Sequence, residues 1–441
     1  MDNLDLDSNS ASNVISLPLS VSPPKPAKVS TPLYDKIKSA GQELDALSTF
    51  KSDFDYQVYR NMEVRYADKP IRGGNTIKTA FRLVNSHSTC QQCLYSFEID
   101  TYGRGCIHDC VYCYAKAQLS VYGYWNNPIP VPIDISEVRK VFYTVFETDR
   151  PNKWREILEK RVPLRIGSMS DSFMWVDEKY GVTLELLKIL KHYKYPNIIF
   201  TRSDLIAEDK YLNAIDRDLT SIQFSMSSTN DKMSRKIEPG APSPSDRLAA
   251  LKKINDRGFW TTVRINPLFP IYPDGYLSDP NFAWKGEVPK FEYTSFDMVD
   301  RIAEAGTTAV LAGFVRLSSS AINAITKASG VDLRQFYRTD IERKSTRDFH
   351  YSDQEIRAYY QQFKQQCVKN AVEFTTCYIG NGEDHFWKDQ DLWSNKSDCC
   401  NAKGKVAAFK TDARKIPFET RLKYTTKKEI PAGDIGRDLE I

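Results

Sequence analysis

The sequence predicts an α/β fold, a partial (β/α)6 barrel of the TIM type, and two observations support this prediction. First, six short runs rich in β-branched and aromatic residues lie between residues 95 and 320 and are typical of strands. Second, helix-like segments of about 10–15 residues separate these runs, which is typical of βαβ units and a parallel sheet. Six such units fit an open barrel, in which functional residues lie at the carboxyl ends of the strands.

Each predicted element follows from its own local pattern. The strands are short apolar runs that end in polar residues, whereas the helices carry apolar residues at helical spacing. Ser245 is predicted to cap one helix and Gly258 to end it. The predicted strands cover residues 95–100, 164–167, 197–202, 221–226, 260–265 and 308–317, and the predicted helices cover residues 111–119, 181–193, 208–216, 245–257 and 295–305.

Extensions flank the predicted barrel core, which spans residues 95–320. Residues 1–50 begin with a stretch rich in Ser, Asn, Pro and Asp, and they are predicted to form a disordered or flexible tail. Residues 51–94 are predicted to form an N-terminal extension that packs on the core. Residues 321–441 are predicted to form a C-terminal α+β extension, with helical structure over 318–344 and 353–370 and a strand over 372–379.

The composition is that of a soluble, metal-binding protein of the cytoplasm. The chain has 441 residues, of which 41% are hydrophobic, and a mean hydropathy of −0.49. No apolar run approaches the roughly 18 residues of a membrane span, and the N-terminus lacks the shape of a signal peptide. Nine cysteines, several of them clustered, favour metal binding in a reducing compartment over a disulfide framework. A net charge of +4 permits a nucleic-acid partner without arguing for one.

Three cysteines follow the first predicted strand at the spacing C-x3-C-x2-C. Cys106, Cys110 and Cys113 lie on a loop that leaves the strand end, so their thiolates can surround one soft metal centre. Zinc usually takes a fourth protein ligand, and none lies nearby in the sequence. The set therefore suggests an iron–sulfur cube with one iron open to another ligand. Tyr112, just before the third cysteine, is expected to shield such a cluster from water.

This phrase resembles the signature of the radical S-adenosylmethionine (SAM) enzymes, and residues 105–115 resemble the branch that contains spore photoproduct lyase. The resemblance implies a [4Fe–4S] cluster on Cys106, Cys110 and Cys113, whose open iron binds the amino and carboxylate groups of SAM. An electron from the cluster would cleave SAM to methionine and a 5′-deoxyadenosyl radical, which abstracts hydrogen from a substrate. A zinc knuckle, or three unrelated buried thiols, is the alternative interpretation.

Polar residues at the end of the second strand are candidates for SAM contacts. Ser168, Ser170 and Asp171 can accept from an ammonium group or hold a ribose, and the family resemblance assigns Ser170 and Asp171 to the amino end of SAM. Asp171 alternatively caps a helix that begins at Ser172. Spore photoproduct lyases carry a hydrogen-donating Cys where this sequence has Ser168. A serine O–H bond is too strong for that role, so the family's repair of spore DNA is doubtful here.

The third strand ends at Arg202, whose guanidinium is predicted to pair with the carboxylate of SAM. A rim ion pair with Glu208 or Asp209 is the alternative. The segment 238–244 resembles the photolyase-like branch, and its prolines are expected to stiffen a loop over the barrel mouth. Three further strand-end residues are predicted to contact cofactor or substrate: Ser225, Asn266 and Arg316. A rim salt bridge is the alternative for Arg316.

The remaining cysteines suggest a second metal site, either an auxiliary [4Fe–4S] cluster or structural zinc. Scattered buried thiols are the alternative, because free Cys packs as a small hydrophobe. Cys367 is expected in the core, and His108 is expected to support the loop rather than to bind metal. Tyr112, Tyr114 and Cys377 are candidate hydrogen donors. The predicted second site consists of Cys90, Cys93, Cys377, Cys399 and Cys400.

These observations predict a radical SAM enzyme that acts on a nucleic acid or a modified base, in DNA repair or base modification. A flavodoxin-like or ferredoxin-like protein is the expected electron donor, and no membrane partner is expected. One alternative is an iron–sulfur or nucleic-acid-binding protein that keeps the barrel but has lost or altered its catalysis. Another is a radical SAM enzyme that acts on protein or RNA.

Overall fold

A computed structural model describes residues 81–83, 93–103, 105–116, 130–271, 291–315, 317–336, 348–349, 353–377, 389–395 and 397–411. The predicted tail at residues 1–50 and most of the extension at 51–94 lie outside the described residues. The same holds for Cys90 and Arg316.

The main sheet has eight strands and does not close. Seven strands run parallel in the order β2-β5-β6-β7-β8-β9-β12, and β1 pairs antiparallel with β2 at one edge. The six predicted strands and the late strand are confirmed, and the late strand is the far edge of the sheet. The strands are β1 (Phe81–Leu83), β2 (Phe97–Ile99), β5 (Leu164–Ile166), β6 (Asn197–Thr201), β7 (Thr220–Ser225), β8 (Trp260–Leu268), β9 (Ala309–Phe314) and β12 (Glu373–Thr376).

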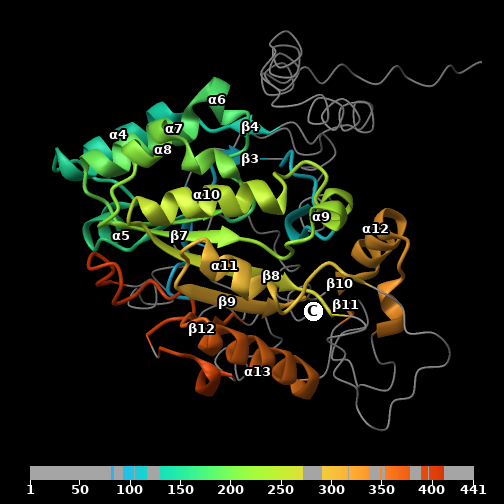
Figure 1. The fold of residues 1–441 in the computed structure, drawn as a ribbon. Coiled ribbons are helices and arrows are strands. Elements are labelled where there is room, and N and C mark those ends of the chain that lie inside the picture. Colours follow the sequence, from blue (N-terminus) through green and yellow to red (C-terminus); the bar gives the residue numbers. More distant parts are fainter. Residues whose placement is uncertain are drawn as a thin grey trace, which may run out of the picture.

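Helices cover one face of this sheet, as an open α/β barrel requires. Figure 1 shows α4, α7, α8 and α10 grouped along one side and α13 beside β12 at the far edge. Within the described residues, no helix is long and apolar enough to cross a membrane. The helices are α4 (Ile135–Phe146), α5 (Arg155–Glu159), α6 (Asp177–Tyr180), α7 (Val182–His192), α8 (Asp209–Ala214), α9 (Asp231–Ile237), α10 (Pro244–Asp256), α11 (Met298–Glu304), α12 (Ser319–Ser329) and α13 (Asp353–Lys369).

Three short 3-10 helices and two small antiparallel pairs complete the described structure. The pairs join β3 (Tyr102–Gly103) to β4 (Val131–Pro132) and β10 (Leu317–Ser318) to β11 (Asp348–Phe349). The 3-10 helices are η2 (Asp204–Ala207), η3 (Leu333–Phe336) and η5 (Gln390–Leu392).

Local chemistry moves several helix ends away from their predicted positions. The prediction that Ser245 caps the helix before Gly258 is wrong, because Ser243 accepts from Asp246 N and Pro244 opens the helix. Proline suits this first position because it lacks an N–H and its φ is already helical. The helix predicted over 318–344 ends at Ser329, where Gly330 takes a left-handed φ of 83°. No helix was predicted for α4, α5, α6 or α9, although α4 buries Val138, Phe142 and Val145 at helical spacing.

The other face of the sheet packs on the C-terminal segment. Strand residues alternate between the two faces, so Ile199 and Ile222 pack with the helices while Ile198 and Leu311 join a second apolar core. That second core contains Trp393, Cys399, Cys400 and Phe409 from the far end of the chain. Backbone carbonyls tie this segment to the sheet, because Cys400 O accepts from Gln223 Nε2 at 2.9 Å and from Thr262 Oγ1 at 3.0 Å. We call this side the inner face.

Candidate active site

Residues 105–113 carry the three predicted cluster ligands. This loop follows β2 and β3 in the chain and is held in a tight turn. Asp109 N donates to Cys106 O at 3.3 Å, and Cys113 N donates to Cys110 O at 3.1 Å. Asp109 has a left-handed φ of 44°, which Asp tolerates better than most residues. Residues 114–116 are helical, and residues 117–119 of the helix predicted there lie outside the described part. We call residues 105–113 the cysteine loop.

The segment after α9 supports the cysteine loop from behind. Val111 N donates to Ile237 O at 2.9 Å, and Gly240 N donates to His108 O at 3.0 Å. The two backbones approach so closely that a Cβ added to Gly240 would lie 1.8 Å from Ile107 O. Only glycine fits at this contact. The 238–244 segment, which the sequence predicts to lie over the barrel mouth, therefore fixes the position of the cysteine loop.

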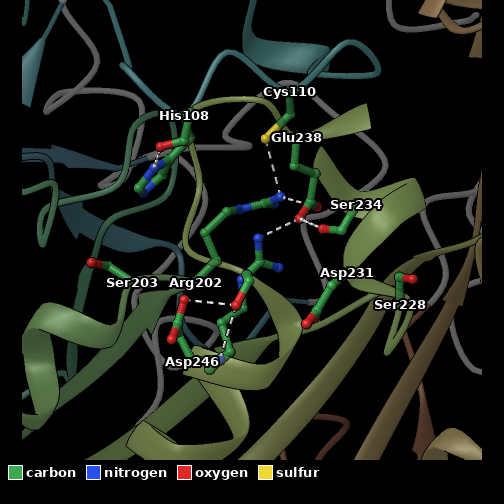
Figure 2. Close-up of polar contacts among 12 residues, drawn as sticks. His108, Cys110, Arg202, Ser203, Ser228, Asp231, Ser234, Glu238 and Asp246 are labelled. Atoms are coloured by element: carbon green, nitrogen blue, oxygen red, sulfur yellow. Dashed lines mark hydrogen bonds and ion pairs between the residues drawn. The ribbon is translucent and has the colours of Figure 1, made fainter. Parts of the chain in front are cut away.

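A buried charge network lies directly beside Cys110. Arg202 Nη1 donates to Cys110 Sγ at 3.1 Å, to Tyr112 Oη at 2.6 Å and to Glu238 Oε1. Figure 2 shows Arg202 extended between Cys110 and Glu238. Tyr112 also donates to Glu238, and Arg247 pairs with the other carboxylate oxygen. The network therefore joins one predicted cluster ligand to a carboxylate and two guanidinium groups.

Glu238 is ionised in this network although it is only 1% exposed. Burial by itself would raise its pKa, but Arg247 and Arg202 lower the pKa from 4.5 to about 2. A buried charge is stable only when it is paired and hydrogen-bonded, and this one receives bonds from four side chains, those of Tyr112, Arg202, Ser234 and Arg247. Nothing in the sequence around Glu238 marks it as the partner of Arg202.

The alternative prediction for Arg202, a rim ion pair with Glu208 or Asp209, is wrong. Glu208 pairs with Lys210, and Asp209 pairs with Lys253 and Arg257. Arg202 reaches inward instead, because its strand end lies over the cysteine loop and Glu238 attracts it there. All three of its side-chain hydrogen bonds to described residues use Nη1. Its predicted pairing with the SAM carboxylate stays a prediction.

Asp171 joins the second and third strand ends to the cysteine loop. It accepts from Thr201 Oγ1 and Arg202 N, each at 2.8 Å, and from Phe173 N at 2.9 Å. His108 Nε2 lies 3.2 Å from its carboxylate. Burial would raise the pKa of Asp171, but His108 and these N–H groups hold it below its ordinary value. The alternative prediction of a helix beginning at residue 172 is wrong.

His108 holds the cysteine loop in place, as predicted. Its Nδ1 lies 3.1 Å from Gly240 O, and its other ring nitrogen faces Asp171. The imidazole therefore bridges the loop to two neighbouring segments.

The serines of the second strand end have different surroundings. Ser170 Oγ donates to Tyr102 O, so its hydroxyl is already used inside the protein. Ser168 Oγ is buried, and no described residue forms a hydrogen bond with it. Asp100, which the sequence analysis does not single out, accepts from Ser168 N at 2.8 Å and from Met169 N at 3.2 Å. Tyr114 Oη donates to Ser168 O at 2.8 Å. The contacts of these serines with SAM stay predictions.

Asn266 lies within β8 rather than after it, because the strand runs on to Leu268 through a register shift. A Cβ on Gly313 of the neighbouring strand would lie 2.7 Å from the Asn266 amide nitrogen. Gly313 thus makes room for the Asn266 side chain. Ser225 is partly exposed at the end of β7. Ser225 thus ends its strand as predicted, whereas the prediction that the fifth strand ends at Asn266 is wrong. The ligand contacts of both residues stay untested.

The chemistry of the cysteine loop fits an iron–sulfur cluster. Burial raises the pKa of all three thiols, and for Cys106 it raises the pKa to about 12. Thiolates are therefore unfavourable here unless a cationic centre neutralises them. Cys106, Cys110 and Cys113 also interact electrostatically with one another, as groups facing a common volume do. Arg202 offers a hydrogen bond to the Cys110 sulfur, a contact of the kind that tunes cluster potentials.

Four of the five cysteines of the predicted second metal site lie in or against one apolar cluster on the inner face. Cys399 and Cys400 belong to it, and Cys93 and Cys377 pack against it. In the described part of the chain, no group of three or more His, Cys, Asp or Glu side chains is arranged to hold a metal ion. The ligands of a four-iron cluster lie further apart than the ligands of a single ion, so this finding argues mainly against zinc. Cys367 is buried in α13, as predicted.

A cavity of about 360 Å³ is lined by the 239–243 segment, next to the network. Its lining includes His108, Asp231 and Asp246, and Figure 2 shows these two acidic residues below the network. Asp231 accepts from Ser245 N and Oγ, and Asp246 accepts from Ser243 Oγ. These carboxylates stabilise the start of α10, which explains them without a ligand.

Comparison with known proteins identifies the class of this domain. Residues 101–278 match the Radical SAM superfamily, and this segment contains the cysteine loop, Arg202 and Glu238. The chain therefore carries a radical SAM domain.

Its relatives among curated proteins are uncharacterized. One from Methanocaldococcus jannaschii is 25% identical over 170 residues, which are 38% of this chain and 58% of that protein. One from Mycobacterium tuberculosis (strain H37Rv) is 24% identical over 178 residues, 39% of this chain and 49% of that protein. One from Acidianus two-tailed virus is 27% identical over 176 residues, 38% of this chain and 54% of that protein. The chain thus spans about half the length of the curated relatives it matches.

Solved structures with a similar course of the chain are more distant in sequence. A spore photoproduct lyase mutant with dinucleoside spore photoproduct has a TM-score of 0.49 at 14% identity, covering 80% of this chain and 96% of that one. Streptococcus suis SuiB bound to S-adenosylmethionine has a TM-score of 0.38 at 12% identity, covering 80% of this chain and 62% of that one.

Proposed function

We propose that this protein is a radical SAM enzyme that abstracts hydrogen from a nucleic acid or a modified base. One observation carries the proposal: three thiols at C-x3-C-x2-C spacing lie on a single, largely buried loop within the segment that matches the superfamily. Cys106, Cys110 and Cys113 would hold a [4Fe–4S] cluster. When bound, that cluster supplies the electron that cleaves SAM to methionine and a 5′-deoxyadenosyl radical.

The protein's own residues position and shield this centre. Tyr112 is 9% exposed and packs edge-on against Phe269 with ring centroids 5.3 Å apart, so it excludes water from the cysteine loop. Arg202 places positive charge beside Cys110, which offsets the negative charge of a thiolate-bound cluster. Gly240 and His108 fix the loop from behind. The strand-end residues Ser225 and Asn266 are proposed to contact SAM.

The substrate class rests on the resemblance of residues 105–115 and 238–244 to the photolyase-like branch. A base in a duplex must be exposed or flipped to reach a barrel mouth, so a single-stranded or damaged site is the expected substrate. Because Ser168 replaces the hydrogen-donating Cys of spore photoproduct lyases, base modification is favoured over repair of the spore photoproduct.

The test is anaerobic reconstitution with iron and sulfide, followed by dithionite and SAM. The wild-type protein is expected to bind about four irons in this cluster and to form 5′-deoxyadenosine, whereas Cys106→Ala, Cys110→Ala and Cys113→Ala should each lose both properties. Cys367→Ala is the matched control, since this buried cysteine lies in α13 away from the cysteine loop. Activity that persists in all three loop variants, or zinc in the loop of anaerobically purified protein, would overturn the proposal.

A second experiment separates the enzyme from a binding protein on the same fold. Oligonucleotides with and without unpaired bases are added to the reconstituted protein, and products are followed by mass spectrometry of digested nucleosides. Binding without 5′-deoxyadenosine formation supports the alternative of a catalytically altered protein. Product formation only on protein or RNA would show that DNA is not the substrate.

A further inference from the structure

Three thiols outside the cysteine loop converge on the inner face of the sheet. Cys377 follows β12, and its N–H donates to Ala312 O at 2.8 Å. Cys399 and Cys400 come from the segment after η5, more than twenty residues further along the chain. We call Cys377, Cys399 and Cys400 the inner thiol group.

The sulfur atoms of the inner thiol group are close but not bonded. Cys399 Sγ lies 4.0 Å from Cys400 Sγ, and Cys377 packs against the same cluster and interacts electrostatically with Cys399. A disulfide would require an S–S separation of about 2.0 Å, so these are free thiols. Adjacent cysteines can join only through a strained eight-membered ring, which leaves Cys377 as the natural partner of Cys399.

The backbone around the two buried thiols is fixed. Cys399 O accepts from Thr375 Oγ1 at 2.5 Å, and Cys400 O accepts from Gln223 and Thr262. Thr375 lies two residues before Cys377 on the same strand, so this bond keeps Cys399 in register with the end of β12. The juxtaposition of Cys377 and Cys399 is therefore built into the fold.

Exposure and charge give the thiols different reactivities. Cys377 is partly exposed, whereas Cys399 and Cys400 are only 5% and 4% exposed. Arg264 Nη1 lies 3.7 Å from Cys400 Sγ, and its guanidinium also hydrogen-bonds to Cys377. Its other neighbours are Gln223 Oε1 at 3.3 Å and the Phe200 ring, so in the described part of the chain no carboxylate pairs with it. The positive charge of Arg264 is thus directed at sulfur.

We propose that Cys377 and Cys399 form a reversible dithiol–disulfide site that exchanges with low-molecular-weight disulfides of the glutathione class. The Cys377 thiolate attacks one sulfur of the small disulfide, which breaks the S–S bond, forms a mixed disulfide and releases one small thiolate. Cys399 then attacks the Cys377 sulfur and gives its proton to a released thiolate. Starting from the Cys377 thiolate, the protein loses two electrons and one proton. One small disulfide becomes one small thiol and one small thiolate, which takes its proton from solvent.

The test equilibrates the full-length protein, under anaerobic conditions, with buffers of reduced and oxidised glutathione. Free thiols are then blocked at low pH, and disulfide-linked peptides are identified by mass spectrometry. A Cys377–Cys399 peptide should appear as the buffer becomes oxidising and disappear when it is made reducing again. Cys377→Ser and Cys399→Ser should each abolish this peptide, whereas Cys400→Ser and Cys367→Ser should retain it.

Three results would overturn the proposal. Cys377 and Cys399 could stay reduced across the whole series, or Cys377 could pair first with Cys93 or Cys400. In the third result, a variant lacking all three cysteines of the cysteine loop would still bind iron or zinc, and adding Cys377→Ser would remove that metal. This result would assign the inner thiol group to a metal. None of these outcomes depends on SAM cleavage, so the proposed function stands or falls separately.

Discussion

The cysteine loop and the inner thiol group each place an arginine beside a cysteine sulfur, but the positive charge of that arginine has different partners in the two regions. Arg202 lies 3.1 Å from Cys110 Sγ and shares its charge with the buried carboxylate of Glu238. Arg264 lies 3.7 Å from Cys400 Sγ, beside the neutral amide of Gln223. In the first region the pKa of each thiol is raised by burial, and in the second the pKa of Cys377 is lowered.

The difference lies in whether a carboxylate shares the charge of the guanidinium. Where Glu238 neutralises Arg202, the thiols remain protonated until a metal centre replaces their protons. Where Arg264 has no carboxylate partner among the described residues, the interaction with Cys399 and the charge of Arg264 together lower the pKa of Cys377. The first arrangement suits cluster binding, and the second suits thiol exchange.

The largest effect is expected from Glu238→Gln, which would leave Arg202 and Arg247 unpaired in the interior. Removing one partner of a buried ion pair costs about 3–5 kcal/mol, so the free energy of unfolding in urea should fall by about that amount. Glu208→Gln, in the half-exposed pair with Lys210, is the control and should cost less than about 1 kcal/mol. Equal losses in the two variants would show that the network does not stabilise the fold.

Acid should weaken the same network. The pKa of Glu238 is about 2 in the folded protein against an ordinary 4.5, so its contribution is complete above about pH 4.5 and is lost as the pH falls toward 2. The shift corresponds to stability on the order of 3 kcal/mol. Urea unfolding of the metal-free protein between pH 6 and pH 3 measures this loss. The slope should be shallower in Glu238→Gln, and an unchanged slope would contradict the assignment.

Gly240→Ala should disturb the cysteine loop without altering any charge. The new methyl group would meet Ile107 O at 1.8 Å, so one of the two backbones must move, at a cost of about 1–3 kcal/mol. Iron bound after reconstitution should fall together with the free energy of unfolding. Gly404→Ala is the control, because it has a positive φ but open space, and it should lose about 1 kcal/mol without loss of iron. Full iron binding in Gly240→Ala would show that the close contact is not needed.

The smallest effect is expected from Arg264→Gln, which removes the positive charge beside the inner thiol group. The pKa of Cys377 should rise, and the rate of its alkylation at pH 7 should fall by about five- to tenfold, as its thiolate fraction decreases. Peptide mass spectrometry after timed exposure to iodoacetamide measures the rate. Arg257→Gln, which loses only surface contacts with Asp209 and Asn213, should leave the rate unchanged. A rate unaffected by Arg264→Gln would remove the basis of the comparison.

Local pattern was enough to predict the strands and the cysteine loop. Every predicted strand is present because alternating apolar runs must be buried wherever the chain places them. The spacing of Cys106, Cys110 and Cys113 places three thiols on one loop whatever the surrounding fold. By contrast, the predicted cap at Ser245 is wrong by two residues, since the competing Ser243–Pro244 pair starts the helix earlier.

The partners of these residues were decided only by the tertiary structure. Glu238 lies 126 residues from Tyr112 in the sequence, and Arg264 lies 136 residues from Cys400. Their charges meet because parallel strands bring distant segments to the same end and the same face of the sheet. The sequence by itself therefore determined which atoms can bind a metal or exchange electrons. Burial and pairing, which depend on the whole fold, decided which thiols are protonated and which carry charge.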